Sequence, residues 1–285
     1  MMTQIFSGKE VAARISSQLA DEVAALKAEN IFPKLAIVRI GERLSDVRYE
    51  HGALNRCAKL GIEVDVHALP ELTTQQELVD LIHTINEDPS IHGCLLLRPF
   101  PKNFDDAYVR NCLAPEKDVD GITDASLAGL VTGTPTGFSP CTAAACMAVL
   151  DHYHIPVEGQ NVVVIGASLV IGRPVAMEFL KREATVTICH IKTRDVALYT
   201  RTADILVAAA GHRNLVTADM VKPGQIILDV GINAAPGGGL CGDVDFEHVS
   251  PIAAGITPVP GGIGSVTTSI LAQHVVQSAA KATLP

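Results

Sequence analysis

A glycine-containing turn from Gly166 to Gly172 is the clearest place where backbone groups of this chain could bind a charged ligand. It follows the apolar run NVVVIG, which predicts a buried strand, and it opens a segment that predicts a helix. N–H groups at the start of a helix attract the pyrophosphate of a dinucleotide, and glycines let the backbone approach it closely. The spacing is not G-x-G-x-x-G, so a turn that only connects a strand to a helix stays open as an alternative.

Two acidic residues, Asp118 and Asp120, lie two positions apart in the pentapeptide KDVDG. An aspartate before a glycine most often accepts hydrogen bonds from its own turn. By itself, the pentapeptide therefore predicts a turn.

The loop TPVPGGIGSVT, which begins at Thr257, combines stiff and permissive backbone positions. Pro258 and Pro260 restrict the chain, whereas Gly261 and Gly262 allow it to approach a ligand closely. The loop is therefore predicted to line a binding site.

Tyr49 and Ala53 are four residues apart on a predicted helix, so they share one face. The tyrosine ring could stack on a flat ligand, but Ala53 carries no group that could move a proton. Arg56 and Arg98 are the nearest cations to consider, and a guanidinium with a pKa above about 12 is a poor proton shuttle. By itself, this helix face carries no evident acid or base.

Amphipathic segments alternate with apolar runs along the whole chain, which is typical of an α/β fold with parallel strands. The turn-forming stretch 132–140 predicts a boundary between two lobes, and the second lobe has the strand–helix rhythm of a nucleotide-binding domain. Strands are expected at 35–40, 62–69, 92–100, 161–166, 184–190, 203–211 and 225–233. Helices are expected at 46–60, 74–86, 141–151, from the glycine turn to Leu180, and at 266–280.

Composition argues against several classes of partner. The net charge is −9 and no basic run or aromatic platform occurs, so no nucleic acid is expected to bind. The chain has no signal-like start and no run approaching the roughly 20 apolar residues that span a bilayer, so no membrane partner is expected. The seven cysteines occur singly, which favours reduced thiols in a cytoplasmic protein. The histidines lack metal-ligand spacing, so no metal is predicted.

Four landmarks together resemble one family: KDVDG, GDVDFE from Gly242, TPVPGGIGSVT, and the run GERLSDVRYEHGALNRCAKLGI. The chain resembles the bifunctional methylenetetrahydrofolate dehydrogenase/methenyltetrahydrofolate cyclohydrolase family from about Ile5 to its last helix. The resemblance implies a two-lobed α/β protein and a homodimer. It implies a folate-binding catalytic domain over 1–139, completed by a C-terminal helix at 267–285, and a Rossmann-type dinucleotide-binding domain over 140–266.

Two family residues with catalytic roles are absent. The family carries Tyr-x-x-x-Lys with the lysine as its central acid/base group, and here Tyr49 is present while Ala53 replaces the lysine. The family's VQLPLP is LLRPFP here, so Leu97 replaces a glutamine that contacts the lysine. The chain therefore resembles a divergent member that lacks the catalytic lysine.

The resemblance also implies which residues bind. Tyr49 would stack on a tetrahydrofolate one-carbon derivative and Asp120 would hydrogen-bond its pterin, and these two form the implied catalytic set. The implied substrate-binding residues are Tyr49, Ala53, Leu97, Pro99, Asp120, Pro260, Gly261 and Gly262. The implied cofactor-binding residues are Gly166, Ala167, Ser168, Ile171, Gly172, Ile191, Ala210, Gly211 and Ile232.

The cofactor is expected to be NAD or NADP, with NAD favoured. The family's GRSxxVGxP is GASLVIGRP here and its HSKT is HIKT. Ala167 and Ile191 cannot give the charge-assisted donors that a 2′-phosphate needs. Arg173, Lys192 and Arg194 are close in sequence and stay open as substitute donors.

Two reactions of the family make different demands. Hydride transfer is largely a matter of positioning, whereas hydrolysis of the methenyl product needs a positioned acid/base group worth typically 10²–10⁴-fold. We therefore predict an NAD(P)-dependent methylenetetrahydrofolate dehydrogenase whose cyclohydrolase activity is weak or lost. The alternatives are a non-catalytic paralogue that binds folate or nucleotide, and a dehydrogenase with a changed substrate.

Overall fold

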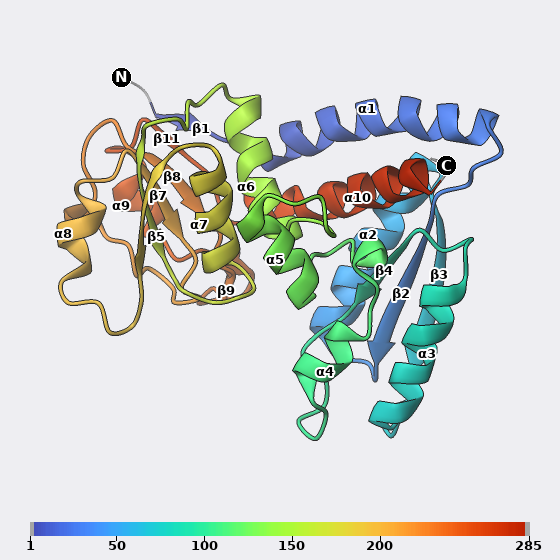
Figure 1. Cartoon of the computed structure of the whole chain (residues 1–285). Coiled ribbons are helices and arrows are strands. Elements are labelled where there is room, and N and C mark those ends of the chain that lie inside the picture. The colour runs from blue at the N-terminus through green and yellow to red at the C-terminus, as the bar shows by residue number, and fades with distance from the viewer. Residues whose placement is uncertain (1–2, 283–285) are drawn as a thin grey trace. The chain divides into compact units, whose positions relative to one another are not determined.

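The structure is a computed structural model that describes residues 3–282. The chain divides into two compact units (Figure 1). The first unit comprises residues 14–141 together with the chain from 268 onward. The second unit comprises the residues up to Ala13 together with 142–267.

The first unit is built on a parallel three-stranded sheet in the order β3-β2-β4. Its strands are β2 (Lys34–Ile40), β3 (Glu63–Leu69) and β4 (Gly93–Leu96). Its helices are α1 from Arg14 onward (Gly8–Ala28 in full), α2 (Leu44–Leu60), α3 (Gln75–Glu87), α4 (Asp106–Asn111), α5 (Asp124–Thr132) and α10 (Thr267–Lys281). The first two predicted strands and the helices at 46–60, 74–86 and 266–280 are confirmed within two residues. The strand predicted over 92–100 is wrong at its end, because prolines at 99 and 101 cannot donate to the ladder.

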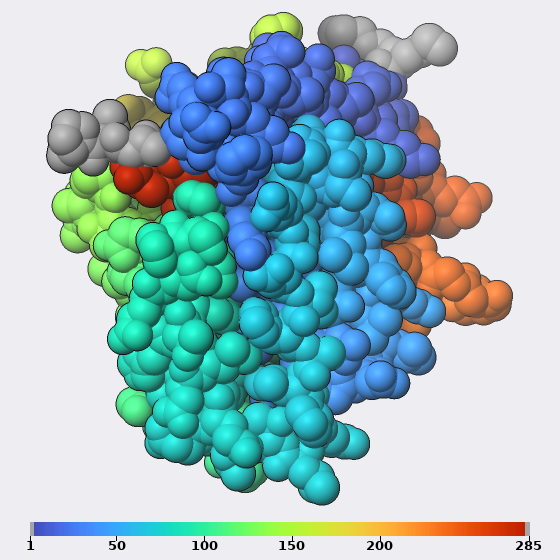
Figure 2. Space-filling model, turned by 90° about the vertical axis from the view of Figure 1, so that its right-hand side faces the viewer, coloured from blue at the N-terminus to red at the C-terminus, as the bar shows by residue number. Residues whose placement is uncertain are grey.

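Helix α3 packs on the sheet of this unit and closes its core. Ala36 and Val38 of β2 lie in one buried cluster with Leu78 and Ile82 of α3. Thr74 begins the helix with a capping box, because its hydroxyl accepts from the Glu77 N–H while the Glu77 side chain accepts from the Thr74 N–H. Figure 2 shows the outer surface of the molecule on the side of α3, where α1 (blue), the β3 region (cyan) and α3 (teal) are visible.

The second unit contains a parallel six-stranded sheet in the order β1-β11-β8-β7-β5-β6. Its strands are β1 (Gln4–Ile5), β5 (Asn161–Ile165), β6 (Thr185–Cys189), β7 (Ile205–Ala208), β8 (Ile226–Asp229) and β11 (Gly255–Ile256), with a hairpin of β9 (Asn233–Ala234) and β10 (Leu240–Cys241). Its helices are α6 (Cys141–His152), α7 (Gly172–Lys181), α8 (Val196–Thr200) and α9 (Phe246–Val249). The four strands predicted in this lobe are confirmed in shorter form, and so are the helix at 141–151 and the helix after the glycine turn. The α/β fold with parallel strands is confirmed.

The central strands of this sheet are apolar because both faces are covered. Val163 and Ile165 of β5 share a buried cluster with Leu206 of β7 and Ile227 of β8. Helix α7 packs against β5 and β6 (Figure 1). Since all six strands run parallel, their carboxyl ends meet at one edge, and the loops that leave them gather there.

Candidate functional site

The glycine turn leaves β5 at the point where the strand order of the second unit reverses. From β5 the chain continues to β6 on one side, and it later returns to β7 on the other side. In open α/β sheets, ligands bind at the carboxyl edge at this kind of switch point. The turn 166–172 therefore occupies the position in the fold that a dinucleotide site requires.

The close approach of neighbouring backbone explains both glycines of this turn. Gly166 has a φ of +123°, and a Cβ on it would lie 2.2 Å from the Ala209 carbonyl oxygen. A Cβ on Gly172 would lie 2.0 Å from the Gly166 carbonyl oxygen. The Ser168 hydroxyl accepts from the Ile171 N–H (3.1 Å) and so satisfies an amide at the start of α7.

The other predicted cofactor residues lie on loops at the same edge. Ile191 follows β6 and is 97% exposed, and Ile232 follows β8 and is 63% exposed. Ala210 and Gly211 follow β7 and are also exposed. The structure thus brings the predicted set to one edge of one sheet, although the roles of these residues stay predictions.

Near Ala167 and Ile191, which are expected to lie beside the 2′ position of a dinucleotide, the Arg173 side chain is held by a hydrogen bond. The Arg173 Nε donates to the Ala167 carbonyl oxygen (3.0 Å), which holds this exposed guanidinium beside the glycine turn. The side chains of Ala167 and Ile191 offer no donor. Arg173 is therefore the residue to test as a phosphate contact.

The TPVPGG loop follows β11 and lines a cavity of about 190 Å³ in the second unit. Other walls of this cavity come from the loop after β8, including Gly231 and Ile232. The Gly8 N–H at the start of α1 donates to the Gly261 carbonyl oxygen (2.8 Å), which fixes the loop. The predicted loop residues Pro260, Gly261 and Gly262 all contribute to this cavity.

In the first unit, Ala53 is fully buried on the inner face of α2, whereas Tyr49 is half-buried. One turn before Ala53, the buried Glu50 carboxylate is paired with the Arg39 guanidinium at 2.8 Å. Leu97 is also buried, and its N–H donates to the Val38 carbonyl oxygen (2.9 Å), which places it beside Arg39 on the sheet. The residues that replace the family's lysine and glutamine therefore adjoin an ion pair whose charges compensate one another.

The structure separates the two aspartates of KDVDG. Asp118 is fully buried and accepts from the Ile122 N–H (3.0 Å), the Thr123 N–H (2.8 Å) and the Ser126 hydroxyl (2.7 Å). The turn role expected of such an aspartate thus belongs to Asp118. Asp120 remains the candidate for binding a ligand.

The carboxyl group of Asp120 titrates in an unusual range. Burial raises its pKa to about 7, and repulsion from Asp118 adds to the rise. A hydrogen bond from the Cys141 thiol and the positive charge of Arg98 act in the opposite direction. Part of the residue is accessible to solvent, so a ligand can reach it. A group with this pKa changes charge near neutral pH, as many functional carboxyl groups do.

The second unit contains two buried carboxylates, Asp229 and Asp243, that are not among the site residues predicted from the sequence. Asp229 is the last residue of β8, and burial raises its pKa to about 6 even though three backbone N–H groups stabilise its charge. Asp243, in the GDVDFE landmark, is fully buried. The GDVDFE landmark pointed to Asp243 but gave no partner for its side chain, and it does not contain Asp229.

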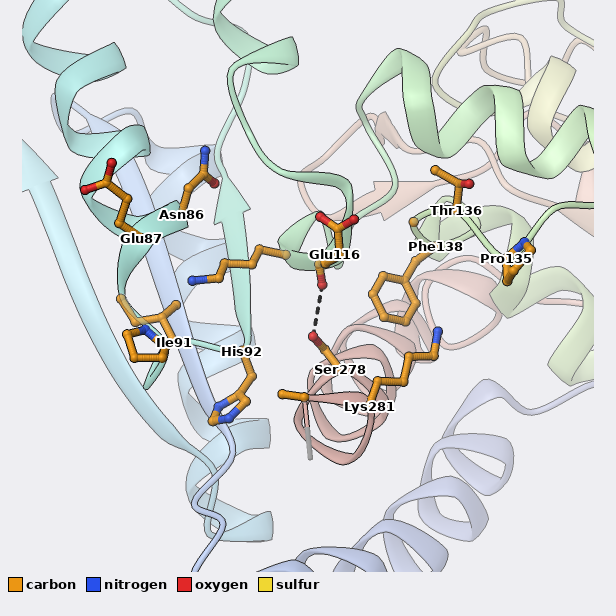
Figure 3. A pocket seen from close by; sticks show the side chains of 14 residues that line it. Asn86, Glu87, Ile91, His92, Glu116, Pro135, Thr136, Phe138, Ser278 and Lys281 are labelled. Carbon is orange, nitrogen blue, oxygen red and sulfur yellow. Dashed lines mark hydrogen bonds between the residues drawn. The ribbon is translucent and has the colours of Figure 1, made fainter. Parts of the chain in front are cut away.

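A larger cavity of about 540 Å³ lies in the first unit and is lined by His92, which precedes β4, and by α10 residues (Figure 3). Tyr49 and Leu97 are associated with the opposite, carboxyl edge of that sheet. Lys117 lines the cavity, but its ammonium donates to the Ile85 and Asp88 carbonyl oxygens (both 2.6 Å) and so caps the end of α3. Lys281 and Glu116 bring opposite charges to the same cavity.

Residues 3–282 contain no group of three or more His, Cys, Asp or Glu side chains placed to hold a metal ion. None of the helices in that range has the length and apolar character needed to cross a membrane. All seven cysteines are unpaired, and five of them are buried.

The fold and the loops at its strand ends define a two-unit α/β protein with a Rossmann-type dinucleotide-binding sheet. Residues 6–120 match the catalytic domain of the tetrahydrofolate dehydrogenase/cyclohydrolase family, and residues 140–283 match the NAD(P)-binding domain of the same family. The chain belongs to this family.

Three relatives illustrate the similarity. The chain is 47% identical over 277 residues to the bifunctional protein FolD of Alkaliphilus oremlandii, covering 97% of both chains. It is similar to the crystal structure of the bifunctional methylenetetrahydrofolate dehydrogenase/cyclohydrolase of Campylobacter jejuni, with 41% identity, 99% of each chain covered and a TM-score of 0.96. The Trypanosoma brucei dehydrogenase-cyclohydrolase, whose structure contains NADP and an inhibitor, is 31% identical, with 100% of each chain covered and a TM-score of 0.94.

Proposed function

We propose that this protein oxidises 5,10-methylenetetrahydrofolate to 5,10-methenyltetrahydrofolate by hydride transfer to a nicotinamide dinucleotide. Membership of the family and the activities for which its relatives are named support this assignment. The observation that carries it is the turn after β5, where neighbouring backbone excludes side chains at Gly166 and Gly172 at the switch point of the sheet. The dinucleotide, when bound, supplies the hydride acceptor, and the part of this chain is to bind and orient the reactants.

Each of the two domains contributes its own proposed binding residues. In the catalytic domain, 1–139 with the helix at 267–285, Tyr49 stacks on the folate and Asp120 accepts from the N–H groups of its pterin. In the dinucleotide-binding domain, 140–266, the turn from Gly166 holds the pyrophosphate. The raised pKa of Asp120 supports its role, because a carboxyl group kept from full ionisation gains most from ligand donors that stabilise its charge.

The cyclohydrolase activity of this protein is proposed to be weak or lost. Ala53 and Leu97 are both buried and apolar, and the nearby Glu50 carboxylate is engaged by Arg39. A positioned acid/base group contributes typically 10²–10⁴-fold to a reaction of this kind, so its absence lowers hydrolysis by that order. Hydride transfer does not need such a group and is retained.

NAD is the proposed cofactor. Ala167 and Ile191 present no donor to a 2′-phosphate, and Ile191 is almost fully exposed. Arg173, held on the Ala167 carbonyl oxygen, supports NADP as the second candidate. A homodimer in the cytoplasm completes the proposal, on the basis of the family and of the unpaired thiols.

The altered nucleotide contacts at Ala167 and Ile191 favour one alternative, a non-catalytic paralogue that binds folate or nucleotide. A dehydrogenase with a changed substrate is less well supported, because Asp120 and the TPVPGG loop are retained. The test is a spectrophotometric assay with 5,10-methylenetetrahydrofolate and each cofactor, which follows reduced cofactor and methenyl product separately. Methenyl product that accumulates with NAD supports the proposal. Binding of folate in a thermal-shift assay without turnover by either cofactor would support the non-catalytic alternative.

A further inference from the structure

Asp243 joins three segments at the carboxyl edge of the second unit. Its Oδ2 accepts from the Ala210 N–H (2.6 Å) and the Gly211 N–H (2.8 Å), which belong to the loop after β7. Its Oδ1 accepts from the Asn233 Nδ2 (2.8 Å), at the start of β9. The side chain is fully buried, so these hydrogen bonds are shielded from water and strong.

The surrounding backbone leaves no freedom for this carboxylate. A Cβ on Gly231 would lie 2.1 Å from the Asp243 Oδ1, so only glycine fits there. The Asp243 N–H donates to the Asp229 Oδ1 (3.0 Å), and the Asp229 N–H donates to the Thr257 hydroxyl (2.7 Å). The Asp243 carboxylate and the backbone and carboxylate of Asp229 thereby link the ends of β7, β8 and β11.

The loop held by Asp243 is open on its other side. Ala210 and Gly211 are exposed, and a Cβ on Gly211 would meet nothing within 4 Å. Asn233, the third partner, directly follows Ile232, which is 63% exposed. The buried Asp243 carboxylate therefore holds two exposed segments, the Ala210–Gly211 loop and the backbone beside Ile232, on their inner side. Both segments lie at the edge of the sheet where the glycine turn lies.

We propose that Asp243, oriented by Asn233, is a positioning residue for the dinucleotide. It holds the Ala210–Gly211 loop and the backbone beside Ile232 in the arrangement that forms one wall of the cofactor site. Asp243 itself does not touch the cofactor. The inference rests on the proposed function, since it assigns that edge to a dinucleotide.

An exchange of donor and acceptor tests this arrangement. Asp243→Asn places an NH₂ group opposite another donor, either the loop N–H groups or the Asn233 amide, so one hydrogen bond is lost. Asn233→Asp places a second carboxylate beside that of Asp243, so the two negative charges repel each other. In the double variant, the introduced amide at 243 donates to the introduced carboxylate at 233 while its oxygen still accepts from the loop. Asp245→Asn, in the same segment, is the matched control, because the Asp245 carboxylate pairs with His248 (2.8 Å).

The readout is NADH affinity by fluorescence titration, with folate binding measured in parallel by thermal shift. Each single variant is expected to weaken NADH binding about tenfold, in line with the loss of one buried hydrogen bond to a charged group. The double variant is expected to recover to within about threefold of the parent, and neither the control nor folate binding is expected to change. A merely structural role would lower the melting temperature without this pattern of loss and recovery in affinity.

Two results would overturn the proposal: folded single variants that bind NADH as the parent does, or a double variant that is no better than the singles. Should the single variants fail to fold, the affinity of the double variant decides in the same way. If the parent binds no dinucleotide, the proposed function fails and Asp243 positions no cofactor. Amide exchange at 210 and 211 then shows separately whether the hydrogen bonds to Asp243 exist.

Discussion

Replacing Ala53 by lysine and Leu97 by glutamine is expected to raise the rate of methenyltetrahydrofolate hydrolysis by about 10²-fold or more, the lower end of what a positioned acid/base group contributes. Ala53 is fully buried, so the new ammonium enters a region of low polarity, which lowers its pKa toward neutrality. The same burial predicts a loss of stability, because a buried cation must be desolvated. The double variant is therefore expected to hydrolyse faster and to melt earlier than the parent.

The ion pair beside position 53 allows a magnitude to be derived. Glu50 precedes it by one helical turn, so their side chains are separated by about 6 Å. At an effective dielectric constant of about 20, a unit charge at about 6 Å contributes about 2.8 kcal/mol, or about 2 pKa units. The Glu50–Arg39 pair has no net charge, so its two effects on a lysine at position 53 largely cancel. Removal of one partner should therefore move the pKa of the lysine in a direction set by the charge that remains.

The pH–rate profile of hydrolysis tests this reasoning. In the background of the two substitutions, Glu50→Gln should shift the apparent pKa of the base downward by about 1–2 units, and Arg39→Gln should shift it upward. His51→Lys adds a lysine on the exposed face of the same helix and is the control for added charge alone. A folded variant that retains dehydrogenase activity but gains no hydrolysis would refute the proposal that position 53 limits cyclohydrolase activity. If hydrolysis increases but its apparent pKa is changed by neither Glu50→Gln nor Arg39→Gln, the electrostatic argument is refuted.

Three further predictions concern the cofactor, the pterin anchor and a helix end. Ile191→Ser should raise kcat/KM for NADP more than that for NAD, and Arg173→Gln should lower the NADP value while leaving the NAD value within about twofold, as steady-state assays with both cofactors would show. Because the pKa of Asp120 is about 7, the KM for folate should fall as pH rises from 6 to 8 and the carboxylate forms, and Asp120→Asn should abolish this dependence. Lys117→Met removes the cation from the end of α3 and should cost about 1–2 kcal/mol in urea unfolding without a change in NADH affinity.

Much of the fold could be predicted because buried parallel strands appear in the sequence as apolar runs. β5 and β7 are four or five residues long and almost wholly buried, so composition alone indicates them. The strand β1 could not be found in this way, because it has two exposed residues and is defined only by pairing with Gly255 and Ile256, about 250 positions along the chain. A pattern of local hydrophobicity contains no information about such a distant partner.

The site was predictable where backbone shape decides and much less so where side-chain partners decide. The glycine turn could be identified because a tight approach to neighbouring backbone demands glycine at given places. The division of roles between Asp118 and Asp120 was indicated only by the family resemblance, since it depends on which carboxylate faces the N–H groups of residues 122 and 123. Asp243 is a similar case, because its partners lie 10 to 33 residues away.

These differences bear on how one activity of the family can be lost while the other survives. The parts of the proposed site that orient reactants are held by backbone geometry at Gly166 and Gly172 and by the hydrogen bonds of the Asp243 carboxylate, and all of these are intact. In the proposed function, proton movement depends instead on a single side chain at position 53, and alanine there removes the reacting group while the family fold is retained. Hydride transfer requires the first kind of structure and hydrolysis requires the second. Loss of cyclohydrolase activity with retention of dehydrogenase activity is therefore the physically expected result of the change at Ala53.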